Sequence, residues 1–119
     1  HRLAALGPAN ATVWLKLELF QHTGSFKPRG CLLAMQALTP EAREQGVVAV
    51  SAGNHGMAVA YAARALGTTA VVAMPSTADP ARIAAVRALG AEVVLEPDIA
   101  AAFARAGALR DASGRSLVH

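Results

Sequence analysis

Apolar residues in this chain fall into short runs separated by longer segments with helical spacing. Four runs are apolar at successive positions, which is typical of strands buried on both faces. They lie at 47–50 (VVAV), 69–74 (TAVVAM), 92–95 (EVVL) and 116–118 (SLV). The helices predicted around them cover 28–38, 55–66, 81–89 and 98–111. This alternation predicts an α/β fold: one parallel sheet with helices on both faces, in three α/β/α layers.

Capping signals place the ends of several predicted helices. Asp79 followed by Pro80 is typical of an N-cap and a first helical turn, and Gly90 is typical of a helix end. Pro28 is predicted to open the helix that follows the loop FQHTGSFK. Because a proline disfavours helical geometry in the preceding residue, Lys27 is expected at the junction between loop and helix.

The segment before that loop has a different pattern. Residues 12–19, TVWLKLEL, place Val13, Leu15 and Leu17 on one face and polar or aromatic side chains on the other. An alternation with a period of two predicts a strand over this whole segment.

Composition limits the classes of function. The 119 residues are 54% hydrophobic and 16% charged, which indicates one folded domain with a large core. The net charge of +3 comes from dispersed arginines with few aromatic residues, a pattern that does not predict a nucleic-acid interface. No apolar run approaches the ~18 residues that span a bilayer, so no membrane association is expected.

The single cysteine and the four histidines also carry little evidence of chemistry. Cys31 cannot form an internal disulfide, which favours a reducing, cytoplasmic location. It lies in the apolar stretch CLLAM, so a buried structural thiol is favoured over a nucleophile. The histidines show no metal-ligand spacing, and no metal is expected.

Lys27 is one of only two lysines, and it lies between Phe26 and Pro28 in HTGSFKPRG. One interpretation is a solvated surface charge. The other is that these neighbours shelter the amine from water. A sheltered, neutral amine forms Schiff bases with carbonyl compounds and with pyridoxal phosphate.

The stretch SAGNHG at 51–56 joins a predicted strand to a predicted helix. Backbone N–H groups at a helix N-terminus favour an anion, and ligands of open α/β sheets bind at the carboxyl ends of strands. The alternative is that Gly53 and Gly56 only permit a tight turn and close packing. Neither GxGxxG nor GxxxxGK[ST] is present.

TGSFKPRG followed by SAGNHG resembles the pyridoxal-phosphate-dependent serine/threonine dehydratases of fold type II, the tryptophan synthase β-like enzymes. The resemblance continues through AVAYAARALGTTAVVAMP and RIAAVRALGAEVVL and covers nearly the whole chain. It implies pyridoxal 5'-phosphate as cofactor and elimination from L-serine or L-threonine to a 2-oxo acid and ammonia. Threonine synthases often have SFKDRG, and many serine racemases have SSGNH. Ala52 replaces the second serine of the racemases, which favours elimination.

The resemblance also implies roles for individual residues. Lys27 holds the cofactor as a Schiff base and then removes the Cα proton of the substrate. Asn54 bonds the ring hydroxyl of the cofactor, with a turn asparagine as the alternative, and Phe26 packs against a cofactor face, with a plain core residue as the alternative. For His55 a helix-capping or structural role is the alternative. The loop expected to receive the substrate carboxylate consists of Ser51, Ala52, Gly53, Asn54 and His55.

By the same resemblance, residues 1–27 belong to the larger lobe of the enzyme and residues 28–119 to the smaller lobe. A glycine-rich phosphate loop and a partner for the pyridine nitrogen are expected elsewhere. The sequence therefore resembles an N-terminal fragment, inactive alone, of a homo-oligomeric cytoplasmic enzyme acting on a small hydroxyamino acid. A truncated lobe serving as a binding or assembly module is the non-enzymatic alternative.

Overall fold

A computed structural model describes residues 2–3 and 12–119 of the chain. Its centre is a sheet of four parallel strands in the order β5-β4-β3-β6. The strands are β3 (Val47–Val50), β4 (Ala70–Pro75), β5 (Glu92–Glu96) and β6 (Ser116–Leu117). All four predicted strands of the sheet are therefore confirmed, with ends that differ by a residue at most.

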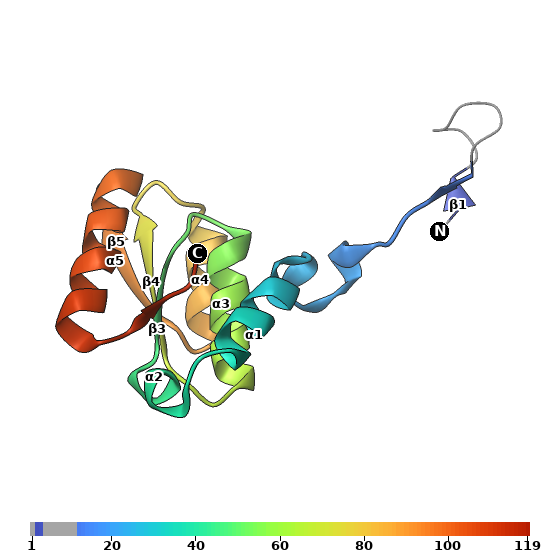
Figure 1. Cartoon of the computed structure of the whole chain (residues 1–119). Coiled ribbons are helices and arrows are strands. Elements are labelled where there is room, and N and C mark those ends of the chain that lie inside the picture. Colours follow the sequence, from blue (N-terminus) through green and yellow to red (C-terminus); the bar gives the residue numbers. More distant parts are fainter. Residues whose placement is uncertain (1, 4–11) are drawn as a thin grey trace.

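Helices cover both faces of this sheet (Figure 1). They are α1 (Lys27–Gln36), α2 (Pro40–Gln45), α3 (Asn54–Ala65), α4 (Pro80–Ala88) and α5 (Ile99–Ser113). Helices α1, α3 and α4 lie on one side of the sheet and α5 lies on the other. The predicted three-layer α/β/α fold is confirmed.

The core divides according to the pleat of the strands. In β3, Val47 and Ala49 join the buried cluster beneath α1, α3 and α4, which also contains Met35. Val48 points to the opposite face and joins Ala102 of α5. All five side chains have no measurable exposure, so β3 is buried on both sides, as its unbroken apolar run predicts.

Aspartate caps hold the helices that follow β4 and β5, and the first of them, Asp79, was predicted from the sequence. The Asp79 carboxylate accepts a hydrogen bond of 2.8 Å from the Ala81 N–H group, which fixes the start of α4. Asp98 caps α5 in the same way through the N–H group of Ala101. Helix α2 was not predicted, because its six residues are too few to show an apolar period.

The start of α1 differs from the prediction. The helix begins at Lys27 rather than at Pro28, and Phe26 is its N-cap residue with helical dihedral angles. The Arg29 N–H group donates to the Phe26 carbonyl at 3.1 Å and closes a first turn around Lys27. Lys27 is thus the first residue of α1, at the junction between loop and helix that the sequence predicted.

The predicted strand over residues 12–19 is wrong beyond its first residues. Only β2 (Val13–Trp14) is extended in a ladder, and it pairs antiparallel with β1 (Arg2–Leu3). The chain then forms two short 3-10 turns, η1 (Glu18–Phe20) and η2 (His22–Gly24). Alternation alone therefore did not produce a strand, because a ladder also needs a paired neighbour.

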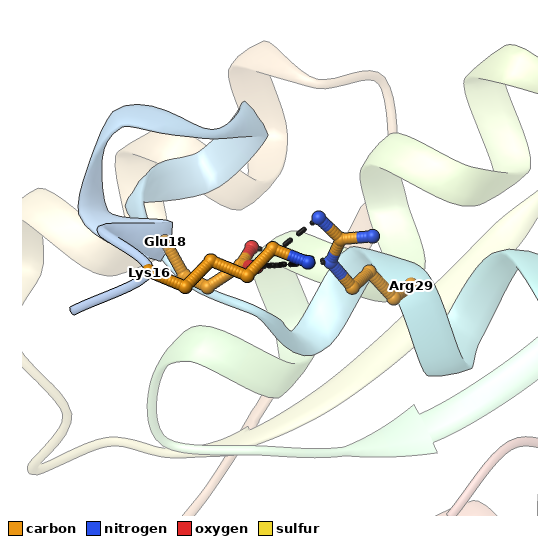
Figure 2. Close-up of polar contacts among 3 residues, drawn as sticks. All are labelled: Lys16, Glu18 and Arg29. Carbon is orange, nitrogen blue, oxygen red and sulfur yellow. Dashed lines mark hydrogen bonds and ion pairs between the residues drawn. The ribbon is translucent and has the colours of Figure 1, made fainter. Parts of the chain in front are cut away.

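An ion-pair group joins the start of these turns to α1 (Figure 2). The Glu18 carboxylate accepts hydrogen bonds from Arg29 Nε at 3.2 Å to each oxygen, and Arg29 Nη2 lies 3.1 Å away. The Nζ atom of Lys16 adds a contact at 3.5 Å. Further on, the ring of His22 stacks on that of Tyr61 in α3, with 4.7 Å between ring centroids. The segment that leads to Lys27 is thus attached to both α1 and α3.

In the part of the chain that the structure describes, no helix combines the length and apolar character needed to cross a membrane.

We predict opposite effects for two alanine substitutions. A Cβ atom at Gly56 would lie 3.1 Å from Val72 Cγ1 and 3.2 Å from Ser51 Cβ, and Val72 is fully buried in β4. Gly56→Ala should lower the free energy of unfolding by about 1–3 kcal/mol through overpacking. Gly107 lies inside α5, and a Cβ atom there would have no neighbouring atom within 4 Å, so Gly107→Ala should raise that free energy by about 0.5–1 kcal/mol. Urea unfolding measures both, and equal effects at the two positions would contradict the packing described.

A second prediction concerns the stability of the protein at low pH. The hydrogen bond from Arg29 holds the pKa of Glu18 below its usual value. A carboxylate with a lowered native pKa contributes stability above its unfolded pKa and loses that contribution as the pH falls through the native pKa. Wild type should therefore be more stable than Glu18→Gln at neutral pH, and the two should converge in acid. Urea unfolding of both proteins from neutral to acid pH measures this difference in stability. A difference that stays constant with pH would contradict the prediction.

Candidate functional site

The carboxyl ends of β3 and β6 lie side by side at one edge of the sheet, because the two strands are parallel neighbours. The first turn of α1 borders the same edge. The start of α1, His55 in α3 and the two residues that follow β6 surround a hollow of about 300 Å³, and residues 51–54 are not part of its lining. It is lined by Phe26, Lys27, Arg29, Gly30, Cys31, Ala34, His55, Val118 and His119. Three of the predicted site residues, Phe26, Lys27 and His55, are therefore brought together.

Lys27 reaches this hollow from the first turn of α1, and its side chain is exposed. The expectation that its neighbours shelter it is wrong for the described chain: Pro28 is buried, but the Phe26 ring is itself 62% exposed. The Lys27 Nζ atom lies 5.9 Å from the centroid of that ring, which is the range of a cation–π contact. Phe26 therefore contacts the amine instead of joining the core.

The turn that follows β3 is fixed by Ser51. This residue is buried, and its hydroxyl accepts a hydrogen bond of 3.0 Å from the Gly53 N–H group. Its own N–H group donates to the carbonyl of Ala73 in β4. The N–H groups of Ser51 and Gly53 are thus both used to hold the turn, and neither is presented to a ligand.

Other donors of the turn remain available. Ala52 and Asn54 are exposed. The N–H groups of Asn54 and His55 precede that of Met57, which donates to the Gly53 carbonyl at 3.4 Å. N–H groups in the first turn of a helix have no intrahelical acceptor, and the helix dipole adds a partial positive charge there. Of the five residues predicted to receive a carboxylate, only Ala52, Asn54 and His55 therefore have backbone N–H groups available to bind an anion.

The imidazole of His55 connects three elements. Its Nε2 atom lies 3.0 Å from the carbonyl oxygen of Val118, after β6, and its Nδ1 atom lies 3.7 Å from the Sγ atom of Cys31 in α1. Because a carbonyl can only accept, Nε2 carries the proton and Nδ1 accepts from the thiol. Both ring nitrogens of His55 are thus engaged within the chain, an arrangement that agrees with the structural alternative for this residue.

Cys31 is a buried thiol, as the sequence predicted. Burial raises the pKa of this thiol, and the charge of Lys27 opposes the effect in part. Sequence reasoning missed its contact with His55, because the two residues come together only through the packing of α1 on α3. Across the described residues, no group of three or more His, Cys, Asp or Glu side chains could hold a metal ion.

The Asn54 amide has a partner that the sequence did not predict. Its Oδ1 atom accepts a hydrogen bond of 2.5 Å from Nη1 of Arg82 in α4. A signal for this contact was present: β3 and β4 are neighbours, so the helices that follow them begin at the same edge of the sheet. Arg82 is the third residue of the helix after β4.

Comparison with known proteins decides the family. The family model described as "Pyridoxal-phosphate dependent enzyme" matches residues 1–119, which is the whole chain. The chain belongs to this family. Phenylserine dehydratase from Ralstonia pickettii is 48% identical over 104 residues, which cover 87% of this chain and 32% of that protein.

Two solved structures of this enzyme class agree in fold. The processed form of threonine deaminase isoform 2 from Solanum lycopersicum superposes with a TM-score of 0.82 at 38% identity, over 87% of this chain and 31% of that one. Maize serine racemase gives a TM-score of 0.84 at 32% identity, over 87% and 32% of the two chains. The resemblance to the dehydratases and the cofactor of the family are thereby confirmed. The chain spans about a third of the length of these relatives.

The residues at this edge suit the cofactor of the family. They offer a primary amine on Lys27, a side-chain amide on Asn54, and backbone N–H groups at the N-terminus of α3. An amine condenses with an aldehyde, and N–H groups at a helix N-terminus donate hydrogen bonds to anionic groups. These groups therefore fit a cofactor that carries an aldehyde and a ring hydroxyl, together with a substrate that carries a carboxylate.

We predict that Cys31 reacts slowly with thiol reagents. Its raised pKa leaves little thiolate near neutral pH, and its side chain is only 4% exposed. Alkylation by iodoacetamide, followed by mass spectrometry, should be at least about tenfold slower in the native protein than in denaturant. Equal rates in the two states would contradict the buried contact with His55.

Proposed function

We propose that the full-length protein removes ammonia from L-serine or L-threonine by β-elimination and yields a 2-oxo acid. The observation that carries this proposal is that Lys27 and His55, the second residue of α3, line one hollow. The amine of Lys27 and the backbone N–H groups at the start of α3 would then bind the same amino acid from neighbouring positions. The similarity to a phenylserine dehydratase and a threonine deaminase supports this choice of reaction.

Lys27 is the residue that would hold the cofactor. Pyridoxal phosphate, when bound, supplies an aldehyde that condenses with amines and a ring that takes up electrons as the Cα–H bond breaks. When it is not bonded to the cofactor, the Nζ atom of Lys27 would be free to accept the Cα proton of the substrate. Lys27 is the first residue of α1, so the helix fixes its backbone. This limits the positions from which its Nζ atom can accept the proton.

The substrate carboxylate would bind at the first turn of α3. The N–H groups of Ala52, Asn54 and His55 are the donors, because those of Ser51 and Gly53 are used inside the turn. The imidazole of His55 contributes by holding this turn against α1 and Val118. Binding the carboxylate here fixes which face of the Cα atom meets Lys27.

Racemisation of serine is the second candidate, supported by the similarity to maize serine racemase. A racemase must deliver a proton to the face of Cα opposite the lysine. Ala52 is exposed on the turn and carries only a methyl group, which neither holds nor moves a proton. This favours elimination. Threonine synthase chemistry has no specific support here.

Reductive labelling tests the role of Lys27. The full-length protein is incubated with pyridoxal phosphate, reduced with borohydride and digested, and the adduct is mapped by mass spectrometry. We expect the label on Lys27, and Lys27→Ala should lose both the label and turnover of L-serine and L-threonine. Lys16 is the matched control, because it is the other lysine of this chain and is exposed; Lys16→Arg should keep both.

The same preparation separates the candidate reactions. With L-serine, the proposal predicts 2-oxo acid in excess over D-serine. D-serine as the main product would favour the racemase. Full turnover in Lys27→Ala would refute the assignment of this lysine, and an absence of both labelling and turnover in the wild type would favour a binding or assembly module.

The homo-oligomeric state, the cytoplasmic location and the division into lobes at residues 27 and 28 stay predictions from the sequence. In Figure 1 the chain before α1 leads away from the sheet, an arrangement that is compatible with such a division.

A further inference from the structure

Arg82 and Asn54 form a side-chain hydrogen bond that joins α4 to the turn after β3. The distance between Arg82 Nη1 and Asn54 Oδ1 is 2.5 Å, which is short for a neutral acceptor and a charged donor. Arg82 is half-buried, whereas Asn54 is exposed. The contact uses the oxygen of the Asn54 amide, and no hydrogen bond within the described chain uses its Nδ2 atom.

The chemistry of this contact fixes the orientation of the amide. A guanidinium has five N–H donors and no acceptor, so the atom that faces it must be the amide oxygen. The Nδ2 atom is then at the other end of the amide plane. Asn54 thus presents an N–H donor, and not a carbonyl, to a ligand at the edge of the sheet.

Gly53 provides the space for this arrangement. A Cβ atom at this position would lie 3.2 Å from Nη1 of Arg82 and 3.8 Å from its Cζ atom. The guanidinium therefore lies directly over the backbone of the turn. Helix α4, which carries Arg82, is capped at its start by Asp79. The lack of a side chain at position 53 leaves room for the guanidinium at this close distance.

We propose that Arg82 is a positioning residue for the reaction: it fixes the amide of Asn54 so that Nδ2 donates to the ring hydroxyl of pyridoxal phosphate. This inference rests on the proposed function, because it needs the cofactor beside Asn54. A positive charge on the oxygen end of an amide also polarises its N–H bonds and strengthens the donor. Arg82 acts through Asn54 and does not touch the cofactor.

The contact itself is tested without cofactor. In the ligand-free full-length protein, the two side-chain N–H signals of Asn54 are followed by NMR. Arg82→Met should shift these signals, and Arg82→Lys should keep them close to wild type, because lysine is also a cationic donor. Arg87→Met is the matched control, since Arg87 is an exposed arginine of the same helix; it should leave the signals unchanged. Unchanged signals in Arg82→Met would overturn the proposal.

The link to the cofactor is tested by a double-mutant cycle on the Kd of pyridoxal phosphate. Arg82→Met and Asn54→Ala should each weaken binding by about tenfold, and the double variant should be no weaker than Asn54→Ala. The absorption maximum of the bound cofactor should shift in the same direction in both single variants. A Gly53→Ala variant should weaken binding in the same direction as Arg82→Met, because its methyl group would press against the guanidinium.

These outcomes separate the inference from the proposed function. If the effects of Arg82→Met and Asn54→Ala on the Kd multiply, Arg82 acts independently and the positioning role is wrong, even when Lys27 carries the cofactor. If pyridoxal phosphate does not label Lys27, the proposed function fails regardless of the NMR result, and the link to the cofactor fails with it. Coupled effects together with labelled Lys27 support both.

Discussion

Parallel pairing of β3 with β4 and β6 is the constraint on which the rest of this molecule depends. It places the carboxyl ends of three strands at one edge of the sheet, and with them the turn at 51–53, the start of α4 and residue Val118. Residues from distant parts of the sequence meet there without any need for a dedicated loop. A one-residue change in this register would separate Arg82 from Asn54 and His55 from Val118.

The turn after β3 is held more firmly than its sequence of small residues implies. Ser51 closes it from inside, His55 fastens it to α1 and to the end of β6, and Arg82 reaches it from α4. Gly56 allows α3 to lie against Val72. Contacts within this chain therefore hold the turn in place, whereas the Lys27 side chain is exposed at the hollow.

The sequence predicted those features that depend on local pattern. The unbroken apolar run at 47–50 identified a strand buried on both faces, and Asp79 with Pro80 identified the start of α4. The alternation at 12–19 predicted a strand that is too long: among the described residues of that segment only Val13 and Trp14 pair with another strand, and Glu18 lies in a 3-10 turn where it bonds Arg29. Contacts such as those of His55 and Arg82 depend on which strands are neighbours, and a single sequence shows that only indirectly.

The central claim is that Lys27 and the first turn of α3 act on one cofactor. A crystal structure of the full-length protein with pyridoxal phosphate tests it most directly. The account predicts a covalent bond from Lys27 Nζ to the cofactor, with the Asn54 side-chain amide at hydrogen-bond distance from the ring hydroxyl. A cofactor bound through another lysine, or a Lys27 side chain directed away from residues 51–56, would contradict it.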